Sequence, residues 1–194
     1  MNHLLSSRVF NLLCMICHNN NFRFHTGDMG RMDAEGWVHV TGRIKEQYKL
    51  ENGKYVVPAP IESAIGMSRF VNQVVVCGAN RPHNVALLVP EWPTIRQELS
   101  IGDDKTDDEL ANEMSVKELI DNDIIESCIK LKKFEIPKEW AFVAPFTAAN
   151  NMLTPKMSIR RHKVMDAYDD LISGMYDSDP IITEAADGAI REAA

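Results

Sequence analysis

Three short stretches of this chain combine charged side chains with turn-forming residues, and these are the places where chemistry could occur. Thr26-Gly27-Asp28 sets a hydroxyl, a flexible backbone and a carboxylate in one turn, and Gly42-Arg43-Ile44-Lys45 offers two cations. The third stretch, residues 150–164, reads NNMLTPKMSIRRHKV and places a Leu-Thr-Pro turn before a basic run. Taken alone, each stretch also has a structural explanation. A Gly-Asp turn is commonly an Asx turn, and Arg43 could form an ion pair on a hairpin.

The elements that position the first two stretches read as short strands joined by turns. Trp37-Val38-His39-Val40 alternates with a period of two, which is typical of a half-buried strand. Glu51-Asn52-Gly53-Lys54 is a signal for a two-residue hairpin, because Asn-Gly adopts positive φ at little cost. Tyr55-Val56-Val57 is the returning strand, and the prolines at 58 and 60 end it.

The motifs of this region occur in an order that resembles a known family. They are TGD at 26–28, GW at 36–37, GRIKE at 42–46 and NGKYV-x-P-x-x-IE at 52–62. Together they resemble the closing half of the AMP-forming acyl-CoA synthetases, in the adenylate-forming superfamily. The sequence of residues 46–56 is most similar to that of the long-chain fatty acid branch. The resemblance covers Phe24 to about Tyr168 and only the mobile, closing portion of such an enzyme.

The resemblance assigns roles to four residues of this region. It implies that Asp28 accepts hydrogen bonds from both ribose hydroxyls of the adenylate, a task that suits the paired oxygens of a carboxylate. It implies that Arg43 is a second ribose or phosphate contact and that Lys45 is the hinge on which the C-terminal domain swings. Gly53 is expected on a loop that approaches the coenzyme A tunnel, where a side chain would obstruct it.

The resemblance also implies a catalytic lysine in residues 150–164, and here the sequence departs from the family pattern. The long-chain branch usually reads T-P-T-x-K before a basic pair, whereas this chain reads TPKMSIRR from Thr154. Ser158 therefore holds the usual lysine position, and Lys156 comes two residues earlier. We expect Lys156 to stabilise the charge on the acyl carboxylate and the α-phosphate. The alternatives are that Lys163 substitutes or that adenylation is impaired.

The arginine pair that follows also has two interpretations. Arg160 and Arg161 can be surface charges of a helix or phosphate ligands, and we favour the surface interpretation.

Composition restricts the class of protein. The chain has 194 residues, 45% hydrophobic and 25% charged, with a net charge of -7, which argues against a nucleic-acid-binding protein. Four cysteines do not suggest a disulfide framework, and Cys77 and Cys128 are expected to be buried thiols in a reducing compartment. The apolar run in residues 9–17 is too short to span a bilayer. His83 is expected to be a solvated loop residue.

The expected fold class is α+β, with a small β-hairpin followed by a small mixed sheet that helices flank. We expect a helix from Ile61 to Phe70 with Glu62 in its first turn, and strands at 71–78 and 85–90 joined by a turn at 80–84. We also expect a solvated acidic loop at 102–109 and a helix at 114–130 whose apolar face includes Ile125 and Ile129.

Residues 1–21, which include a formal C-x-x-C-H match at 14–18, are expected to be an unmatched, disordered or aberrant N-terminus. Residues 22–44 are expected to be the tail of a large nucleotide-binding domain, residues 45–168 the mobile C-terminal domain, and residues 169–194 an acidic tail.

The functional prediction is the C-terminal portion of a long-chain fatty acid–CoA ligase. ATP with Mg²⁺, a fatty acid and coenzyme A would be substrates of the complete enzyme, bound through an N-terminal domain, and no metal site is expected in this chain. Alone, the chain is expected to be inactive, because it contains no phosphate loop, adenine pocket or acyl tunnel. The alternatives are a non-catalytic binding or regulatory module and a ligase for a different acid. The expected location is cytoplasmic or peripheral on an intracellular membrane.

Overall fold

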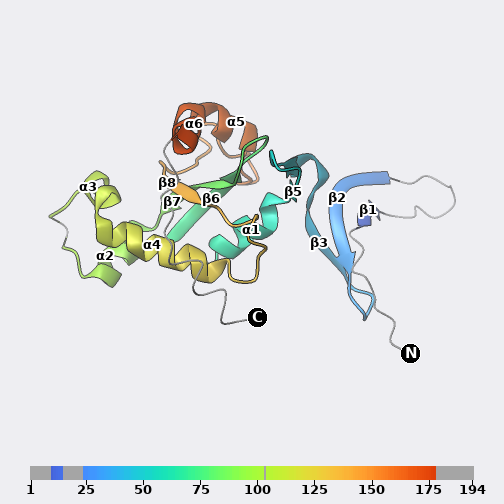
Figure 1. Ribbon diagram of the computed structural model, residues 1–194, viewed down its shortest axis with the longest axis horizontal. Helices are drawn as coiled ribbons and strands as arrows, with labels where there is room; N and C mark the ends of the chain where they lie inside the picture. Colours follow the sequence, from blue (N-terminus) through green and yellow to red (C-terminus); the bar gives the residue numbers. More distant parts are fainter. Residues whose placement is uncertain (1–9, 15–23, 103, 178–194) are drawn as a thin grey trace. The chain divides into compact units, whose positions relative to one another are not determined.

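The computed structural model describes residues 10–14, 24–102 and 104–177. The chain divides into two compact units, Met1–Pro145 and Phe146–Ala194 (Figure 1). Most of the C-x-x-C-H match and most of the acidic tail lie outside the described residues.

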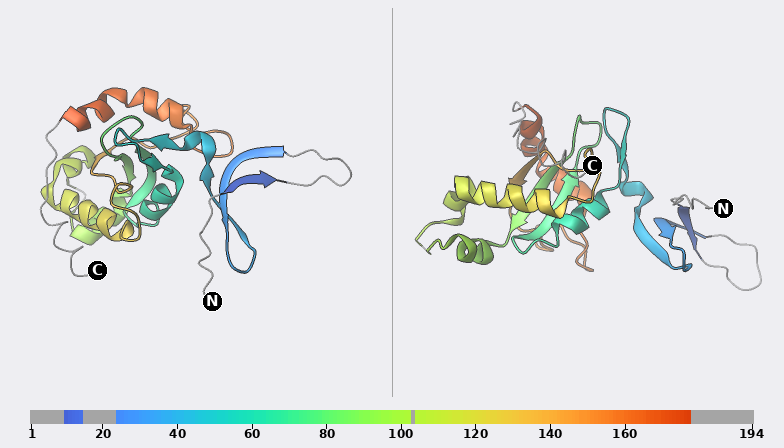
Figure 2. Two further views of the ribbon diagram at one scale, coloured as in Figure 1. Left: turned by 45° about the vertical axis from the view of Figure 1, so that its right-hand side comes forward. Right: turned by 60° about the horizontal axis from the view of Figure 1, so that its bottom comes forward.

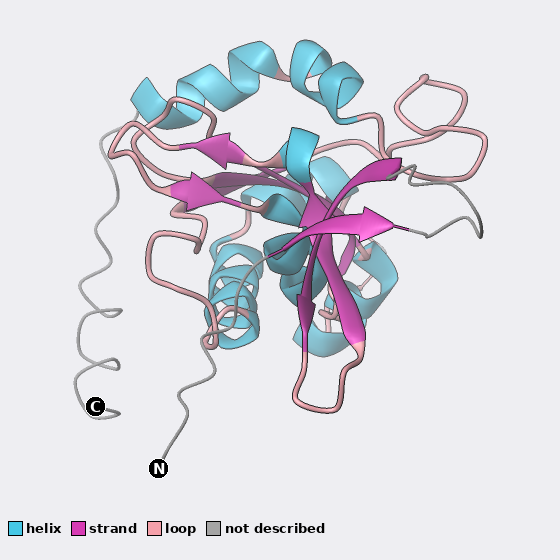
Figure 3. Ribbon diagram, turned by 90° about the vertical axis from the view of Figure 1, so that its right-hand side faces the viewer, coloured by secondary structure: helices cyan, strands magenta, loops and turns pink. Residues whose placement is uncertain are grey.

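The first unit begins with a three-stranded antiparallel sheet in the order β1-β2-β3. Its strands are β1 (Phe10–Cys14), β2 (Phe24–Met32) and β3 (Val38–Arg43). β1 lies within the segment that we expected to be unmatched or disordered, and it pairs with β2 from Phe10↔Gly30 to Cys14↔Phe24. β2 and β3 pair with a bulge next to Gly30, and we call this strand pair the ribbon. The turn that joins the two strands is the free end of the ribbon (Figure 3).

A short connecting segment leads from the ribbon to the first helix. It comprises the 3₁₀ helix η1 (Ile44–Glu46) and the strand pair β4 (Tyr48–Lys49) and β5 (Tyr55–Val56). The helix α1 (Pro58–Ile65) then has prolines in its first turn, where the absent N–H groups leave no hydrogen bond unmade. Residues 44–56 thus form one 3₁₀ turn and one short strand pair between β3 and α1.

The central element of the first unit is a mixed three-stranded sheet. β6 (Val71–Cys77) pairs antiparallel with β7 (Val85–Pro90), and β7 pairs parallel with β8 (Glu139–Phe142). The core packs side chains of this sheet against α1 and against α4 (Met114–Ser127). This α+β arrangement, with a small mixed sheet among helices, confirms the predicted fold class (Figure 2).

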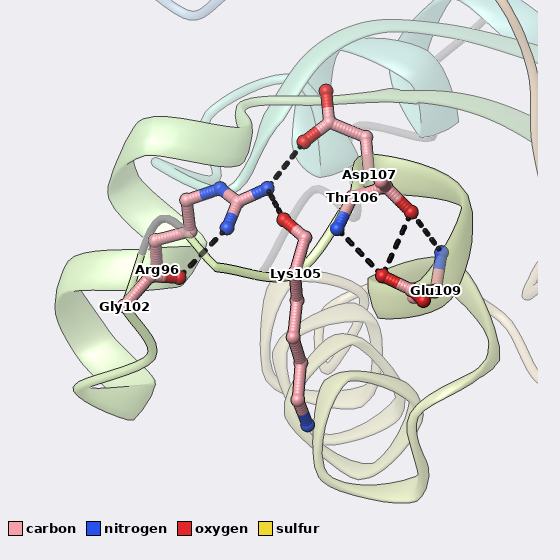
Figure 4. A network of polar contacts seen from close by, with 6 residues as sticks. All are labelled: Arg96, Gly102, Lys105, Thr106, Asp107 and Glu109. Carbon is pink, nitrogen blue, oxygen red and sulfur yellow. Dashed lines mark hydrogen bonds and ion pairs between the residues drawn. The ribbon is translucent and has the colours of Figure 1, made fainter.

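Two helices and a tightly bonded loop connect β7 to α4. They are α2 (Trp92–Leu99) and α3 (Asp107–Asn112). The Arg96 guanidinium donates to the carbonyls of Gly102 at 3.0 Å and Lys105 at 2.8 Å (Figure 4). Thr106 and Glu109 form a capping box at the start of α3. Part of the segment that we expected to be an acidic loop is therefore a helix, since its acidic residues favour a helix N-terminus.

The second unit carries the basic stretch. Leu153 and Ile159 form an antiparallel bridge, and the helices α5 (Arg161–Ala167) and α6 (Asp169–Asp177) follow. The rings of Phe146 and Tyr168 lie edge to face with 6.5 Å between their centroids. The residues that we expected to begin an acidic tail are thus helical as far as Asp177.

Three local expectations differ from the structure. The helix after the prolines runs from Pro58 to Ile65, whereas we expected it to run from Ile61 to Phe70. Glu62 lies beyond the first turn, and its carboxylate accepts a hydrogen bond from the Val76 backbone at 2.7 Å. Ile125 on α4 and Ile129, two residues beyond its end, are exposed and not part of the buried face. The buried residues are spaced four apart, from Val116 to Cys128. Each of the two isoleucines directly follows one of these residues in sequence, so it lies away from the buried face.

The expected burial of two thiols is confirmed. Cys77 and Cys128 are both free and buried. Burial, with a smaller contribution from the nearby Asp123 charge, raises the pKa of the Cys128 thiol to about 11. An un-ionised, enclosed thiol has no nucleophilic role, so Cys128 is a packing residue.

Candidate functional site

Asp28 and Arg43 lie directly opposite one another on neighbouring strands. The β2–β3 register pairs Asp28 with Arg43, and the Arg43 Nε atom lies 3.6 Å from the Asp28 Oδ1 atom. Residues that face each other in an antiparallel pair project from the same side of the sheet. The ribbon therefore places a carboxylate and a guanidinium together at the end that leads into η1. The Arg43 side chain is 72% exposed, so it can turn toward a ligand.

The base of the ribbon lies close to the start of α1. At Gly42, a Cβ atom would come within 2.6 Å of the Val57 Cγ1 atom, which is closer than carbon atoms normally approach. Gly42 therefore allows β3 to lie close to Val57, the residue before α1.

Lys45 lies in the middle of η1 and is exposed. The backbone N–H of Gln47 donates to the Ile44 carbonyl at 3.3 Å and closes this single turn. A one-turn 3₁₀ helix has few hydrogen bonds to break, which suits a backbone that must change its torsion angles. The hinge role of Lys45 stays a prediction.

Gly53 lies on the loop between β4 and β5, with a φ of 85°. The Gly53 N–H donates to the Leu50 carbonyl, and the Leu50 N–H donates to the Lys54 carbonyl, both at 2.9 Å. These bonds make a loop of three residues with glycine in the left-handed region, where we expected a two-residue turn. A Cβ atom at Gly53 would meet the Lys49 Cε atom at an ordinary 3.7 Å, so the backbone conformation requires glycine here and the neighbouring atoms do not.

The amide of Asn84, which we expected in a simple turn, is buried and anchors this loop. Asn84 is fully buried, accepts a hydrogen bond from the Tyr48 hydroxyl at 2.7 Å and donates to the carbonyls of Phe134 and Glu135 at 3.1 and 2.9 Å. Burying an amide is favourable only when its hydrogen bonds are made, as they are here. Asn84 thus joins β4 to the residues before β8. The only signal in the sequence was an asparagine directly before an apolar strand.

His83, the neighbour of Asn84, is shielded from solvent, contrary to our expectation of a solvated residue. Its side chain is 14% exposed, and its Nε2 atom lies 3.9 Å from the Glu139 Oε1 atom. Burial, followed by the charge of Lys138, lowers the pKa of His83. The surroundings of His83 therefore favour its neutral imidazole.

Lys156 lies at an exposed turn of the second unit. The Met157 N–H donates to the Thr154 carbonyl and the Thr154 N–H donates to the Ser158 carbonyl, both at 2.8 Å. Met157 takes a φ of 61°, which is uncommon for a residue other than glycine. Lys156 is thus presented at the tip of a tight loop, and Ser158 begins the return toward Ile159.

The first arginine of the basic pair is held by its own unit. The Arg160 Nη1 atom donates to the Asn151 Oδ1 atom at 2.6 Å, and its backbone N–H donates to the Met152 carbonyl at 2.8 Å. These contacts give Arg160 a structural role at the start of α5, whereas we favoured a surface charge on the helix itself. Lys163, the alternative to Lys156, is exposed on α5.

A cavity of about 210 Å³ lies beside the ribbon. It is lined by Met29, Arg31, Thr41, Val57, Pro60, Ile61, Leu131 and Glu135. Its lining contains Met29, which follows Asp28 in sequence, and Thr41 of β3, but neither Asp28 nor Arg43. In the part of the chain that the structure describes, no group of three His, Cys, Asp or Glu side chains could hold a metal ion. No helix among those residues is long and apolar enough to cross a bilayer.

The family model for the AMP-binding enzyme C-terminal domain matches residues 45–180. The chain belongs to this family. The match begins within η1, immediately after the strand that carries Arg43.

Curated relatives point to the long-chain branch. The chain is 34% identical over 160 residues to fatty acyl-CoA synthetase B of Dictyostelium discoideum, covering 79% of this chain and 24% of the relative. It is 33% identical over 159 residues to long-chain-fatty-acid–CoA ligase 5 of Mus musculus, covering 79% and 23%. The chain thus spans about a quarter of the length of the relatives it matches.

Solved structures agree on the fold. The A-PCP didomain of a carboxylic acid reductase from Segniliparus rugosus, in complex with AMP, superposes with a TM-score of 0.65 at 25% identity, covering 79% of this chain and 20% of that one. The adenylation domain of a carboxylate reductase from Mycobacterium chelonae gives a TM-score of 0.66 at 23% identity, covering 80% and 23%. The resemblance stated from the motifs is therefore confirmed at the level of family and fold.

Proposed function

We propose that this chain supplies the closing, C-terminal portion of an AMP-forming long-chain fatty acid–CoA ligase and acts only with a large nucleotide-binding domain. The observation that carries the proposal is the Asp28–Arg43 pair, 3.6 Å apart and placed just before the residues at which the family domain begins. A carboxylate beside an exposed guanidinium suits a ribose and its phosphate.

The reaction would proceed in two steps. In the first, a carboxylate oxygen of the fatty acid attacks the α-phosphorus of ATP, and the bond to pyrophosphate breaks. In the second, the thiolate of coenzyme A attacks the acyl carbon, and the bond to AMP breaks. Lys156 would stabilise charge in the first step, and rotation about Lys45 would bring the Gly53 loop to the coenzyme A tunnel for the second.

ATP would enter with Mg²⁺, and the described residues do not fit the metal, because they contain no suitable cluster of carboxylates or histidines. We therefore assign the metal to the large domain and derive no step through it. The proposed location is the cytoplasm or the surface of an intracellular membrane, which fractionation of cells that express the tagged chain would distinguish.

An add-back assay tests this function. The full chain is mixed with the separately expressed large domain of a long-chain relative, and pyrophosphate release and acyl-CoA formation are followed. We expect turnover by the mixture and none by either part alone. Lys156→Ala should lower turnover about 100-fold or more, the usual loss when a charge-stabilising group is removed, whereas Lys163→Ala should leave it unchanged.

A second candidate function rests on Ser158, which occupies the usual position of the lysine. If that substitution has ended catalysis, the chain is a non-catalytic binding or regulatory module. Ser158→Lys separates the two functions. Activity in this variant together with an inactive wild-type mixture would overturn the ligase proposal and establish the module. Equal loss in Lys156→Ala and Lys163→Ala would overturn the assignment of Lys156.

A further inference from the structure

The base of the loop between β4 and β5 is held from outside by residues 78–84, which join β6 to β7. The Asn80 N–H donates to the Lys49 carbonyl at 2.9 Å. The Glu51 N–H donates to the Arg81 carbonyl at 3.0 Å. We call residues 78–84 the clasp. Its two hydrogen bonds fix the backbone at Lys49 and Glu51, where the loop begins.

The clasp ends in a side chain that is itself held by three segments. Asn84 is fully buried, and its Oδ1 atom accepts a hydrogen bond from the Tyr48 hydroxyl at 2.7 Å. Its Nδ2 atom donates to the carbonyls of Phe134 and Glu135. Its backbone carbonyl accepts from the Lys138 N–H at 2.9 Å. Turning this amide would leave buried polar groups unpaired, so Asn84 fixes the clasp and β4 against the residues before β8.

The tip of the loop contrasts with its base. Asn52, Gly53 and Lys54 are all exposed. The Lys54 N–H donates to the Asn52 Oδ1 atom at 3.1 Å and the Gly53 N–H to the Leu50 carbonyl at 2.9 Å, so these bonds stay within the loop. A Cβ atom at Gly53 would meet nothing closer than the Lys49 Cε atom at 3.7 Å. A fixed base beneath an open tip is a preorganised arrangement, of the kind that supports a functional loop.

We infer that Asn84 is a positioning residue for the transfer of the acyl group to coenzyme A. Its amide touches no substrate and acts through Tyr48 and the clasp, which together hold the Gly53 loop in place. The inference rests on the proposed function, in which this loop serves the second step only. Because a displacement of about 1 Å can slow a reaction about 100-fold, loosening the base of the loop should slow that step and leave acyl-adenylate formation intact.

Two tyrosines of the same hairpin give a matched pair of variants. Tyr48→Phe removes the hydroxyl that donates to Asn84, whereas Tyr55→Phe makes the same change at a tyrosine that is 62% exposed on β5. Asn84→Ala is a stronger change. Circular dichroism and a thermal transition first verify that each variant folds, and Tyr48→Phe alone decides the test if Asn84→Ala does not fold.

The two steps are measured separately. Each full chain is mixed with the large domain of a long-chain relative. Pyrophosphate released in the first turnover without coenzyme A reports the first step. Conversion of the preformed acyl-adenylate to acyl-CoA, after coenzyme A is added, reports the second.

We expect Tyr48→Phe to slow acyl transfer about tenfold and Asn84→Ala about 100-fold, both with pyrophosphate release at the wild-type rate. Tyr55→Phe should match wild type in both steps. A merely structural role for Asn84 would slow both steps together, and that outcome would overturn the inference. Acyl transfer in Tyr48→Phe equal to that in Tyr55→Phe would overturn it as well.

Hydrogen exchange in the chain alone separates failure of this inference from failure of the proposed function. The amides of Leu50 and Gly53 should exchange faster in Tyr48→Phe than in Tyr55→Phe, because the base of the loop opens more often. Equal exchange would overturn the role of the clasp, whatever the enzyme assay gives. No turnover by the wild-type mixture would refute the proposed function and the positioning role with it. Normal wild-type turnover without a difference between the two tyrosine variants would refute the positioning role alone.

Discussion

At the scale of single residues, His83 makes folding stability depend on pH. Burial and the Lys138 charge lower its pKa from the ordinary 6.5. Below that value the unfolded chain binds more protons at this histidine than the folded chain does. The free energy of unfolding should therefore be unaffected by His83 above about pH 6.5 and should fall as the pH drops through the lower, folded-state pKa.

Replacing His83 tests that dependence. His83→Gln removes the titrating group, so the loss of stability between pH 7 and pH 5 in urea titrations should be smaller than in wild type. His162 is an exposed histidine on α5, and His162→Gln is the control. It should lose as much stability as wild type over this pH range. If His83→Gln loses as much stability as wild type between pH 7 and pH 5, the surroundings of His83 do not disfavour its charged imidazole.

At the scale of elements, the start of α3 depends on one threonine. Thr106 Oγ1 accepts from the Glu109 N–H at 3.3 Å, and Glu109 Oε2 accepts from the Thr106 N–H at 2.8 Å. Thr106→Ala should lower the free energy of unfolding by about 1 kcal/mol, and Thr106→Ser should preserve it. The backbone N–H and then the hydroxyl of Thr106, both of which donate to the Glu109 carboxylate, lower the pKa of Glu109. Of these two bonds the alanine variant loses only the hydroxyl bond, so its stability difference from wild type should shrink as the pH falls through that pKa. Equal stability of the alanine variant at neutral pH would contradict this role.

The sequence predicted those elements whose signal is local. The β-branched run at residues 71–77 forms β6, and the Thr-Pro turn lies where we expected it. The T-x-x-E box at Thr106 was also local, and it was overlooked because the acidic run suggested a solvated loop. Glu62 could not be placed from the sequence, since its partner, the Val76 N–H, is fourteen residues away and belongs to another element.

The candidate site also combines an element that a local pattern indicates with contacts that no local pattern encodes. The alternation of residues 37–40 indicated the strand β3, but Thr26-Gly27-Asp28, which we expected to be a turn, lies within β2. The pairing of Asp28 with Arg43 depends on the register of the β2–β3 hairpin, which the sequence did not reveal. The anchoring of the Gly53 loop by Asn84 depends on carbonyls 50 and 51 residues further along the chain, and no local pattern encodes that contact. The role of Lys156 stays a prediction, because the turn that presents it does not show what it reaches.

At the scale of the whole molecule, the main hydrophobic core lies within the first unit. Its buried members run from Leu50 to Cys128, all before the boundary at Pro145. A chain that ends at Pro145 should therefore fold without the second unit, because it keeps the mixed sheet and the helices α1 and α4 that enclose this core. We expect a cooperative thermal transition and near-wild-type circular dichroism in that truncated chain. The variant Val76→Asp, which buries a charge in this core, is the control and should abolish the transition in either length. A truncated chain without a cooperative transition would show that residues 146–194 are needed for the first unit to fold.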